Sequence, residues 1–212
     1  MTTPHPRPNI VIDAGPALNF FSLSKQGILI DCLGPLSMPQ TVVREVQRKA
    51  EQDRRFSAAA GVLRNLRGSV HLNILEDNST NPALAAAAGR ISLQPLAERL
   101  RRAADQGELM VISHTAVLVE AGANVTMLID DGPARQLAKK EITRLQALRT
   151  QNPATGCAYL ISTPQVLTAA IGTRHIPDKK TMRELFGKMR TLDDGLTAET
   201  QSRLLEHANW YR

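Results

Sequence analysis

The chain has 212 residues, of which 42% are hydrophobic, and a chain of this size can bury a full core within one domain. Only 3% of the residues are aromatic, which argues against a binding surface built from stacked aromatic rings. The formal charge of +6 favours a polyanionic partner such as a nucleic acid, although many basic proteins bind nothing acidic.

The cysteines and the first residues indicate the cellular compartment. Cys32 and Cys157 lie in apolar surroundings without the Cys-x-x-Cys or Cys/His spacing of a zinc site, so we expect buried thiols in a reducing compartment rather than a disulfide. Residues 1–8 contain no apolar leader segment, and no later stretch reaches the length of a membrane span. We therefore expect a cytoplasmic protein that does not enter a membrane.

Apolar runs alternate with helical patterns along the chain. Strands are expected at 9–13, 36–38, 70–75 and 125–129, with a further short apolar segment at 157–161. Helices are expected at 14–25, 28–33, from Thr41, within 53–69, at 83–88, 93–104, 108–120 and 134–145, from Thr163, and two or three times over 178–212. This alternation predicts an α/β fold with a central parallel sheet between two helical layers. We expect one domain, 1–212, with a helical insertion at 53–104 and a C-terminal helical extension at 178–212.

Two of the expected strands end in carboxylates. Asp13 follows residues 9–12, and Asp130 and Asp131 follow residues 125–129. Since the carboxyl ends of adjacent parallel strands converge on one crevice, acids placed there by two strands can meet in space. Each Asp has a plainer interpretation as a turn residue or a helix N-cap.

Two glutamates extend this acidic set. Glu45 falls about one turn inside the helix for which Thr41 is a good N-cap, and Glu108 opens the helix that precedes the second of these strands. Taken singly, each glutamate is explained by the favourable interaction of a carboxylate with the helix dipole. Taken together, the five acids would repel one another unless basic side chains pair with them or a metal cation neutralises them. Oxygen ligands of this kind suit Mg²⁺ or Mn²⁺.

The acids and the net charge point to the same chemistry. Divalent ions held by carboxylates lower the pKa of a bound water and clamp a phosphodiester for in-line attack. The sequence contains no His/Cys set that would compete for zinc. We therefore expect a nuclease that depends on a metal ion.

Four segments carry these acids in a characteristic order. They read Asp13-Ala14-Gly15-Pro16-Ala17-Leu18, Pro39-Gln40-Thr41-Val42-Val43-Arg44-Glu45, Asp105-Gln106-Gly107-Glu108 and Ile129-Asp130-Asp131-Gly132-Pro133-Ala134-Arg135. In order and spacing they resemble a subgroup of PIN-domain proteins, the fold of the VapC-type toxin ribonucleases. The resemblance runs from about residue 9 to residue 190 and implies a PIN-like three-layer fold.

The resemblance also implies a function. It assigns catalysis and the binding of Mg²⁺ or Mn²⁺ to four acids, with one close alternative for the last place: Asp13, Glu45, Glu108 and Asp131, with Asp130 as the alternative. Family members of this kind cut single-stranded or structured RNA, often as homodimers, and a small antitoxin protein holds the toxins silent. Two departures stand out, because Gly15 replaces a small hydroxyl residue and the 53–104 insertion is long for a minimal toxin.

Other polar residues have two interpretations each. Asn19 either binds a ligand acid or the phosphate, or is an ordinary helix residue, and Arg135 either contacts a phosphate or pairs with a carboxylate. His114, on an apolar helix, is more often a satisfied side chain than a general base. Seven arginines form either an RNA-facing surface or merely a solvated face: Arg54, Arg55, Arg64, Arg67, Arg99, Arg101 and Arg102.

Two other functions fit parts of the pattern. A non-catalytic PIN-like module would bind RNA or a partner protein through its basic face, with steep salt dependence and no scission. A phosphotransfer domain with an acid pocket fits less well, because the second residue after Asp13 is Gly15 rather than the Asp of an Asp-x-Asp motif.

Overall fold

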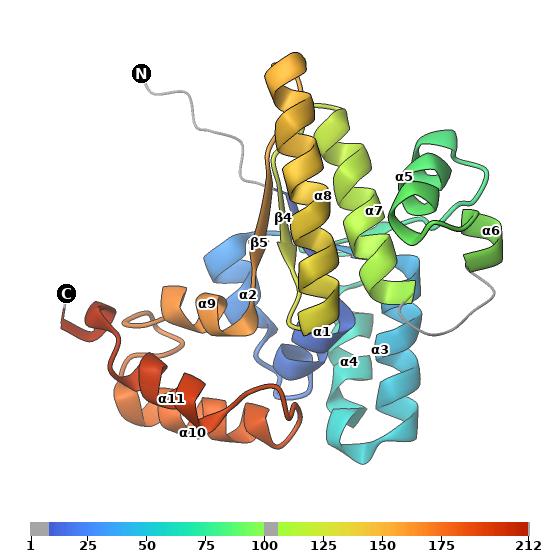
Figure 1. Cartoon of the computed structure of the whole chain (residues 1–212). Coiled ribbons are helices and arrows are strands. Elements are labelled where there is room, and N and C mark those ends of the chain that lie inside the picture. The colour runs from blue at the N-terminus through green and yellow to red at the C-terminus, as the bar shows by residue number, and fades with distance from the viewer. Residues whose placement is uncertain (1–8, 100–105, 212) are drawn as a thin grey trace.

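The computed structural model describes residues 9–99 and 106–211 and contains one five-stranded sheet (Figure 1). All neighbouring strands run parallel, in the order β3-β2-β1-β4-β5. The strands are β1 (Asn9–Ile12), β2 (Leu36–Pro39), β3 (Leu72–Leu75), β4 (Val125–Leu128) and β5 (Ala158–Ile161). The expected strands are confirmed, with the third beginning two residues later than predicted.

Helices fill the connections between the strands. They are α1 (Ala14–Phe21), α2 (Gln26–Leu33), α3 (Gln40–Gln52), the 3₁₀ helix η1 (Arg54–Phe56), α4 (Ser57–Leu66), α5 (Pro82–Ser92), α6 (Leu96–Arg99), α7 (Gln106–Glu120), α8 (Gly132–Gln151), α9 (Thr163–Ala169), α10 (Lys179–Arg190), α11 (Ala198–Leu205) and the 3₁₀ helix η2 (Ala208–Tyr211). Within these residues, no helix combines the length and the apolar character needed to cross a membrane.

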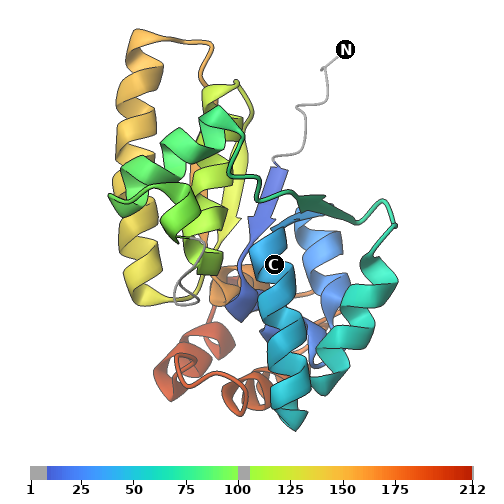
Figure 2. The same cartoon turned by 90° about the vertical axis from the view of Figure 1, so that its right-hand side faces the viewer.

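The central strands are apolar on both faces, as is usual in a parallel sheet whose helical connections cover both sides. All four residues of β4 are buried, as are the last three of β1. Helices α7 and α8 cover one face, while α2 and α9 contact each other on the opposite face (Figures 1 and 2). The predicted α/β class with three layers is therefore confirmed.

The pairing of β1 with β4 decides where the acids lie. The two strands are in register from Asn9 opposite Val125 to Ile12 opposite Leu128, so both end at the same height. Asp13 follows one of these strands directly, and Asp130 follows the other after a single residue. The register thus brings the first and the fourth acidic motif to the same edge of the sheet.

The stretch 53–104 does not form one separate body. Strand β3 is an edge of the sheet, and Phe56 and Leu63 are part of the main hydrophobic core. By contrast, α5 and α6 enclose a small cluster of their own with Met110 of α7. Within the described residues, the helix expected at 93–104 begins three residues later, as α6 at Leu96, because Leu93 adopts the left-handed conformation that ends α5.

The remaining expected features are partly inside the described residues. Arg101, Arg102 and Asp105 lie outside them. Cys32 and Cys157 are free thiols, but both are half-buried rather than buried as expected. The 178–212 extension forms α10 and α11, which lie beyond the carboxyl edge of the sheet, and Phe186 and Leu204 join the main core (Figure 1).

Candidate functional site

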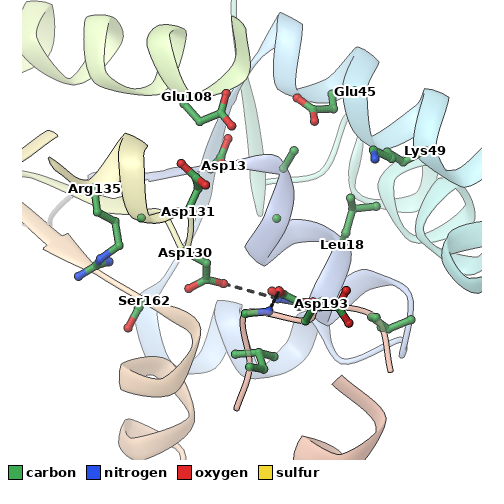
Figure 3. Close-up of a pocket in the computed structure, with 18 of the residues that line it drawn as sticks. Asp13, Leu18, Glu45, Lys49, Glu108, Asp130, Asp131, Arg135, Ser162 and Asp193 are labelled. Carbon is green, nitrogen blue, oxygen red and sulfur yellow. Dashed lines mark hydrogen bonds between the residues drawn. The ribbon is translucent and has the colours of Figure 1, made fainter. Parts of the chain in front are cut away.

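A cavity opens at the carboxyl edge of the sheet, between β1 and β4. The strand order reverses at this point, and ligand sites of open α/β sheets lie in the crevice beyond such a reversal. The cavity has a volume of about 620 Å³. Its walls carry seven carboxylates, most of which Figure 3 labels: Asp13, Glu45, Glu108, Asp130, Asp131, Asp193 and Asp194. The expected convergence of the five predicted acids on one crevice is confirmed.

Asp13 is the most deeply placed of these acids. It is only 4% exposed, and its Oδ1 atom has no hydrogen-bond partner. Burial and, after it, the charges of Glu108, Glu45 and Asp130 together raise the pKa of Asp13 to about 8, against a hydrogen bond from the Ala14 backbone that lowers it. At neutral pH and without a cation, this carboxyl group therefore keeps its proton.

Glu45 reaches the cavity from the second turn of α3, and Glu108 reaches it from the first turn of α7. Both side chains are half-buried. Gly107 leaves room for the carboxylates of Glu45 and Asp13. A Cβ atom at this position would lie 2.9 Å from Glu45 Oε2 and 3.4 Å from Asp13 Oδ1. A side chain at residue 107 would therefore push the carboxylate of Glu45 away from Asp13.

A buried network holds the two helices that carry these glutamates. The carboxylate of Asp77, which follows β3, accepts hydrogen bonds from the backbone N–H of Thr41 (2.5 Å) and from the Thr41 hydroxyl. Its other oxygen lies 2.8 Å from His114 Nε2. The Asp77 side chain is 2% exposed and the His114 side chain 11%. Asp77 therefore fixes α3 one turn before Glu45 and α7 less than two turns after Glu108.

This network settles two sequence predictions. His114 is a satisfied side chain, as expected. Thr41 is not the N-cap of its helix, because α3 begins at Gln40 and Pro39 occupies the cap position. The Thr41 hydroxyl donates to Asp77 instead. Asp77 also accepts from the backbone N–H of Thr41, as an N-cap side chain would, although Asp77 lies outside this helix.

The adjacent acids Asp130 and Asp131 have different partners. Asp130 accepts hydrogen bonds from the backbone N–H (2.7 Å) and the hydroxyl (2.5 Å) of Thr163, at the start of α9. Burial raises the pKa of Asp130, the bonds from Thr163 oppose this, and the charge of Asp193 adds to the rise. Asp131 is exposed and caps α8 by accepting a bond from Ala134 N (2.8 Å). Both still face the cavity.

The two predicted substrate-binding residues are already engaged. Asn19 is 1% exposed, and its Nδ2 atom donates to Asp193 Oδ2 (2.8 Å) and, at 3.5 Å, to Asp130 Oδ2. Arg135 Nη1 donates to the carbonyl oxygens of Ile129 (2.7 Å) and Ile161 (2.9 Å), which ties the ends of β4 and β5 together. A phosphate contact by Asn19 or Arg135 stays a prediction.

Sequence analysis missed three residues at or beside the cavity. Asp193, Asp77 and Lys49 are not among the predicted site residues, although Asp193 and Lys49 line the cavity. A signal for Asp193 was present, because the tripeptide Asp-Asp-Gly occurs at 130–132 and again at 193–195. Both copies border the same cavity.

The carboxylates share a cavity without forming a finished metal cage. In the part of the chain that the structure describes, no three or more Asp, Glu, His or Cys side chains are arranged to hold a metal ion as they stand. Of the predicted basic surface, Arg54, Arg64 and Arg67 are exposed, and Arg55 pairs with Asp53 at 2.7 Å.

A scan of protein-family models and searches of curated proteins and solved structures found no match to the chain.

The raised pKa of Asp13 predicts a stability that falls with pH. An unfolded aspartate loses its proton near pH 3.8, whereas the buried Asp13 keeps it up to about 8, so unfolding releases a proton between these values. The contribution to stability is complete below pH 3.8 and is lost as the pH rises through 8. In EDTA, the melting temperature of Asp13→Asn should therefore rise relative to that of wild type by several degrees between pH 5 and pH 9, since about 1 kcal/mol corresponds to roughly 2–4 °C at this size.

Thermal unfolding followed by circular dichroism at several pH values measures this difference. Asp178→Asn is unsuitable as a control, because Asp178 caps α10, whereas Asp194→Asn removes an exposed carboxylate that borders the same cavity. Equal melting temperatures of wild type and Asp13→Asn across the whole pH range would contradict the burial argument.

Proposed function

We propose that the chain is a PIN-like, metal-dependent endoribonuclease that hydrolyses RNA phosphodiester bonds in this cavity. The observation that supports it best is the Asp13 carboxylate, which is buried among other acids and has one oxygen without a partner. A carboxylate in such a place costs stability in the absence of a cation. Sites that do chemistry commonly keep groups of this kind.

The donors in the cavity fit a hard divalent cation. Every candidate ligand is a carboxylate, which is the ligand type of Mg²⁺ and Mn²⁺. Mg²⁺ usually keeps several of its waters, through which carboxylates can also hold it, so a wide cavity is compatible with it. Asp13, Glu45, Glu108 and Asp131 would hold the cation, with Asp130 beside them.

When bound, a divalent ion supplies an activated water and neutralises charge on the scissile phosphate. The residues of the chain contribute the rest. Thr163 holds Asp130 through two hydrogen bonds, and Asp77 keeps the helices of Glu45 and Glu108 in place. Carboxylates held in this way need little rearrangement during the reaction.

The surroundings of the cavity suit a long, charged substrate. Lys49 lines the cavity, and Arg48 is exposed beside it on α3. A second cavity of about 420 Å³ borders Glu108 and Asp131 and is lined in part by Leu109 and Leu137. We propose that RNA phosphates follow the basic side chains and that a neighbouring nucleotide occupies the second cavity.

The resemblance to the toxin ribonucleases adds proposals about partners. It suggests a homodimer, a cytoplasmic location where RNA is available, and a small antitoxin protein that blocks the cavity. A non-catalytic RNA- or protein-binding module is the alternative, and Gly15 favours it because this position lacks the hydroxyl group common in the family. The space is present, since a Cβ atom on Gly15 would meet nothing within 4 Å.

Cleavage of RNA should depend on the buried acids. With Mg²⁺ or Mn²⁺, we expect Asp13→Asn, Glu45→Gln and Glu108→Gln each to lower the cleavage rate of a mixed RNA pool by roughly a hundredfold or more. Glu51→Gln is the matched control, because Glu51 is exposed on the same helix as Glu45 and lies outside the cavity lining. Gel analysis of the products, with an EDTA arm, measures the rates.

Two outcomes would contradict the proposed reaction. Cutting that continues in EDTA would show that no divalent cation takes part. Cutting that is equal in Asp13→Asn and wild type would place the chemistry elsewhere. RNA binding without any cutting would favour the binding module.

The small residue at 107 should matter for the cation and not for the fold. In Gly107→Ala, the methyl group should push Glu45 Oε2 away, and we expect Mn²⁺ affinity to fall about tenfold while the melting temperature in EDTA stays the same or rises slightly. Gly15→Ala, the matched control, places its methyl group in open space and should change the affinity by less than about twofold. Isothermal titration calorimetry measures the Mn²⁺ affinity of both variants, and an equal affinity in Gly107→Ala and wild type would refute the packing argument.

A further inference from the structure

The turn that follows α10 brings an additional carboxylate into the cavity. In residues 191–196, Asp193 N donates to Met189 O (3.0 Å), and Leu196 N donates to Asp193 O (3.2 Å). Asp193 Oδ1 accepts from Gly195 N (2.8 Å), while Leu196 is buried in the main core. The turn is therefore anchored on both sides of Asp193, and it leaves the other carboxylate oxygen, Oδ2, facing into the protein.

Asp193 and Asp130 converge on a single amide group. Asn19 Nδ2 donates to Asp193 Oδ2 at 2.8 Å and lies 3.5 Å from Asp130 Oδ2. Figure 3 shows Asp130 and Asp193 at the same end of the cavity, with dashed lines for the hydrogen bonds that join each of them to the amide of Asn19. Because Asn19 is almost fully buried, this shared donor is held in a fixed place.

The donors to these two acids are neutral. The hydrogen bonds recorded for Asp130 and Asp193 come from Thr163, Asn19 and Gly195. Neutral donors orient a carboxylate but do not cancel its charge, so Asp130 and Asp193 still repel each other, although the charge of Arg135 offsets part of that of Asp130. In the same cavity, the 4% exposed Asp13 has an oxygen without a partner, which is an independent sign that a ligand belongs here.

We propose that Asp193 binds a divalent cation together with Asp130, so that the turn 191–196 becomes part of the cation site and is held in place by the cation. The inference rests on the proposed function for the presence of a cation in the cavity. It goes beyond that proposal because it adds a ligand from the C-terminal helical extension. The extension then completes the site rather than merely covering it.

Replacement of Asp193 by Asn tests this inference through binding of Mn²⁺ alone. The amide preserves the shape of the side chain and one acceptor oxygen but removes the charge. We expect isothermal titration calorimetry to show Mn²⁺ affinity about tenfold weaker in Asp193→Asn. Asp194→Asn removes one charge from the exposed neighbour in the same turn and should change the affinity by less than about twofold.

Hydrogen exchange in the wild-type chain gives a second reading that needs no variant. Mn²⁺ should slow exchange of the backbone amides of residues 192–196 at least about threefold relative to EDTA, as expected when a ligand stabilises a local structure. An unchanged affinity in Asp193→Asn, or exchange in this turn that is insensitive to Mn²⁺, would overturn the inference. Equal losses in both Asp variants would also overturn it, because they would indicate only a general charge effect.

The results separate this inference from the proposed function. Mn²⁺ binding that weakens in Asp193→Asn, without RNA cleavage by the wild type, would support the inference and contradict the nuclease proposal. RNA cleavage by the wild type, together with the same Mn²⁺ affinity in Asp193→Asn as in the wild type, would support the nuclease proposal and contradict the inference. A wild-type chain that binds no Mn²⁺ would contradict both.

Discussion

The mutual repulsion of carboxylates at the ends of β1 and β4 is the constraint on which the cavity depends. Asp13 is buried, and three neighbouring acids raise its pKa further after burial has done so. Each kcal/mol lost in this way is a considerable part of the marginal stability of a folded chain. The rest of the molecule has to hold these groups together against their own charges.

Hydrogen bonds from other residues hold the acids and their helices in place. Thr163 binds Asp130, Ala134 N binds Asp131, and Asp77 clamps the two helices that carry the glutamates. Each of these contacts joins elements that are distant in the sequence or fixes a helix start. The positions of the acids are therefore set by packing and hydrogen bonds, while their charges work against them. Such an arrangement is typical of a site that trades stability for function.

The location of the main acids could be predicted because it follows from local rules. A buried apolar run ending in Asp predicts a strand end, and parallel strands bring such ends together, as they do for Asp13 and Asp130. Asp193 could not be placed in this way. It meets Asn19 across 174 residues of sequence, through the packing of α10 and the turn after it, and no periodicity in the chain encodes that contact.

Helix starts show the same limit on a smaller scale. A threonine before an apolar helical pattern is an ordinary N-cap signal, yet Thr41 donates to Asp77, which is 36 residues away. The chemistry of the residue was predicted correctly, as a polar side chain at a helix start, but its partner was not. Local sequence reports what a side chain can do, and the tertiary fold selects the partner with which it does it.

The distribution of charge links the cavity to the surface around it. The chain carries a net charge of +6, although its main cavity is lined by seven carboxylates, so basic residues must be in excess elsewhere. A polyanion would be attracted to the molecule as a whole and repelled by the cavity until a cation occupies it. Under the proposed function, bound cations offset part of the negative charge of the cavity, so a phosphate is accepted beside the acids only when cations are present.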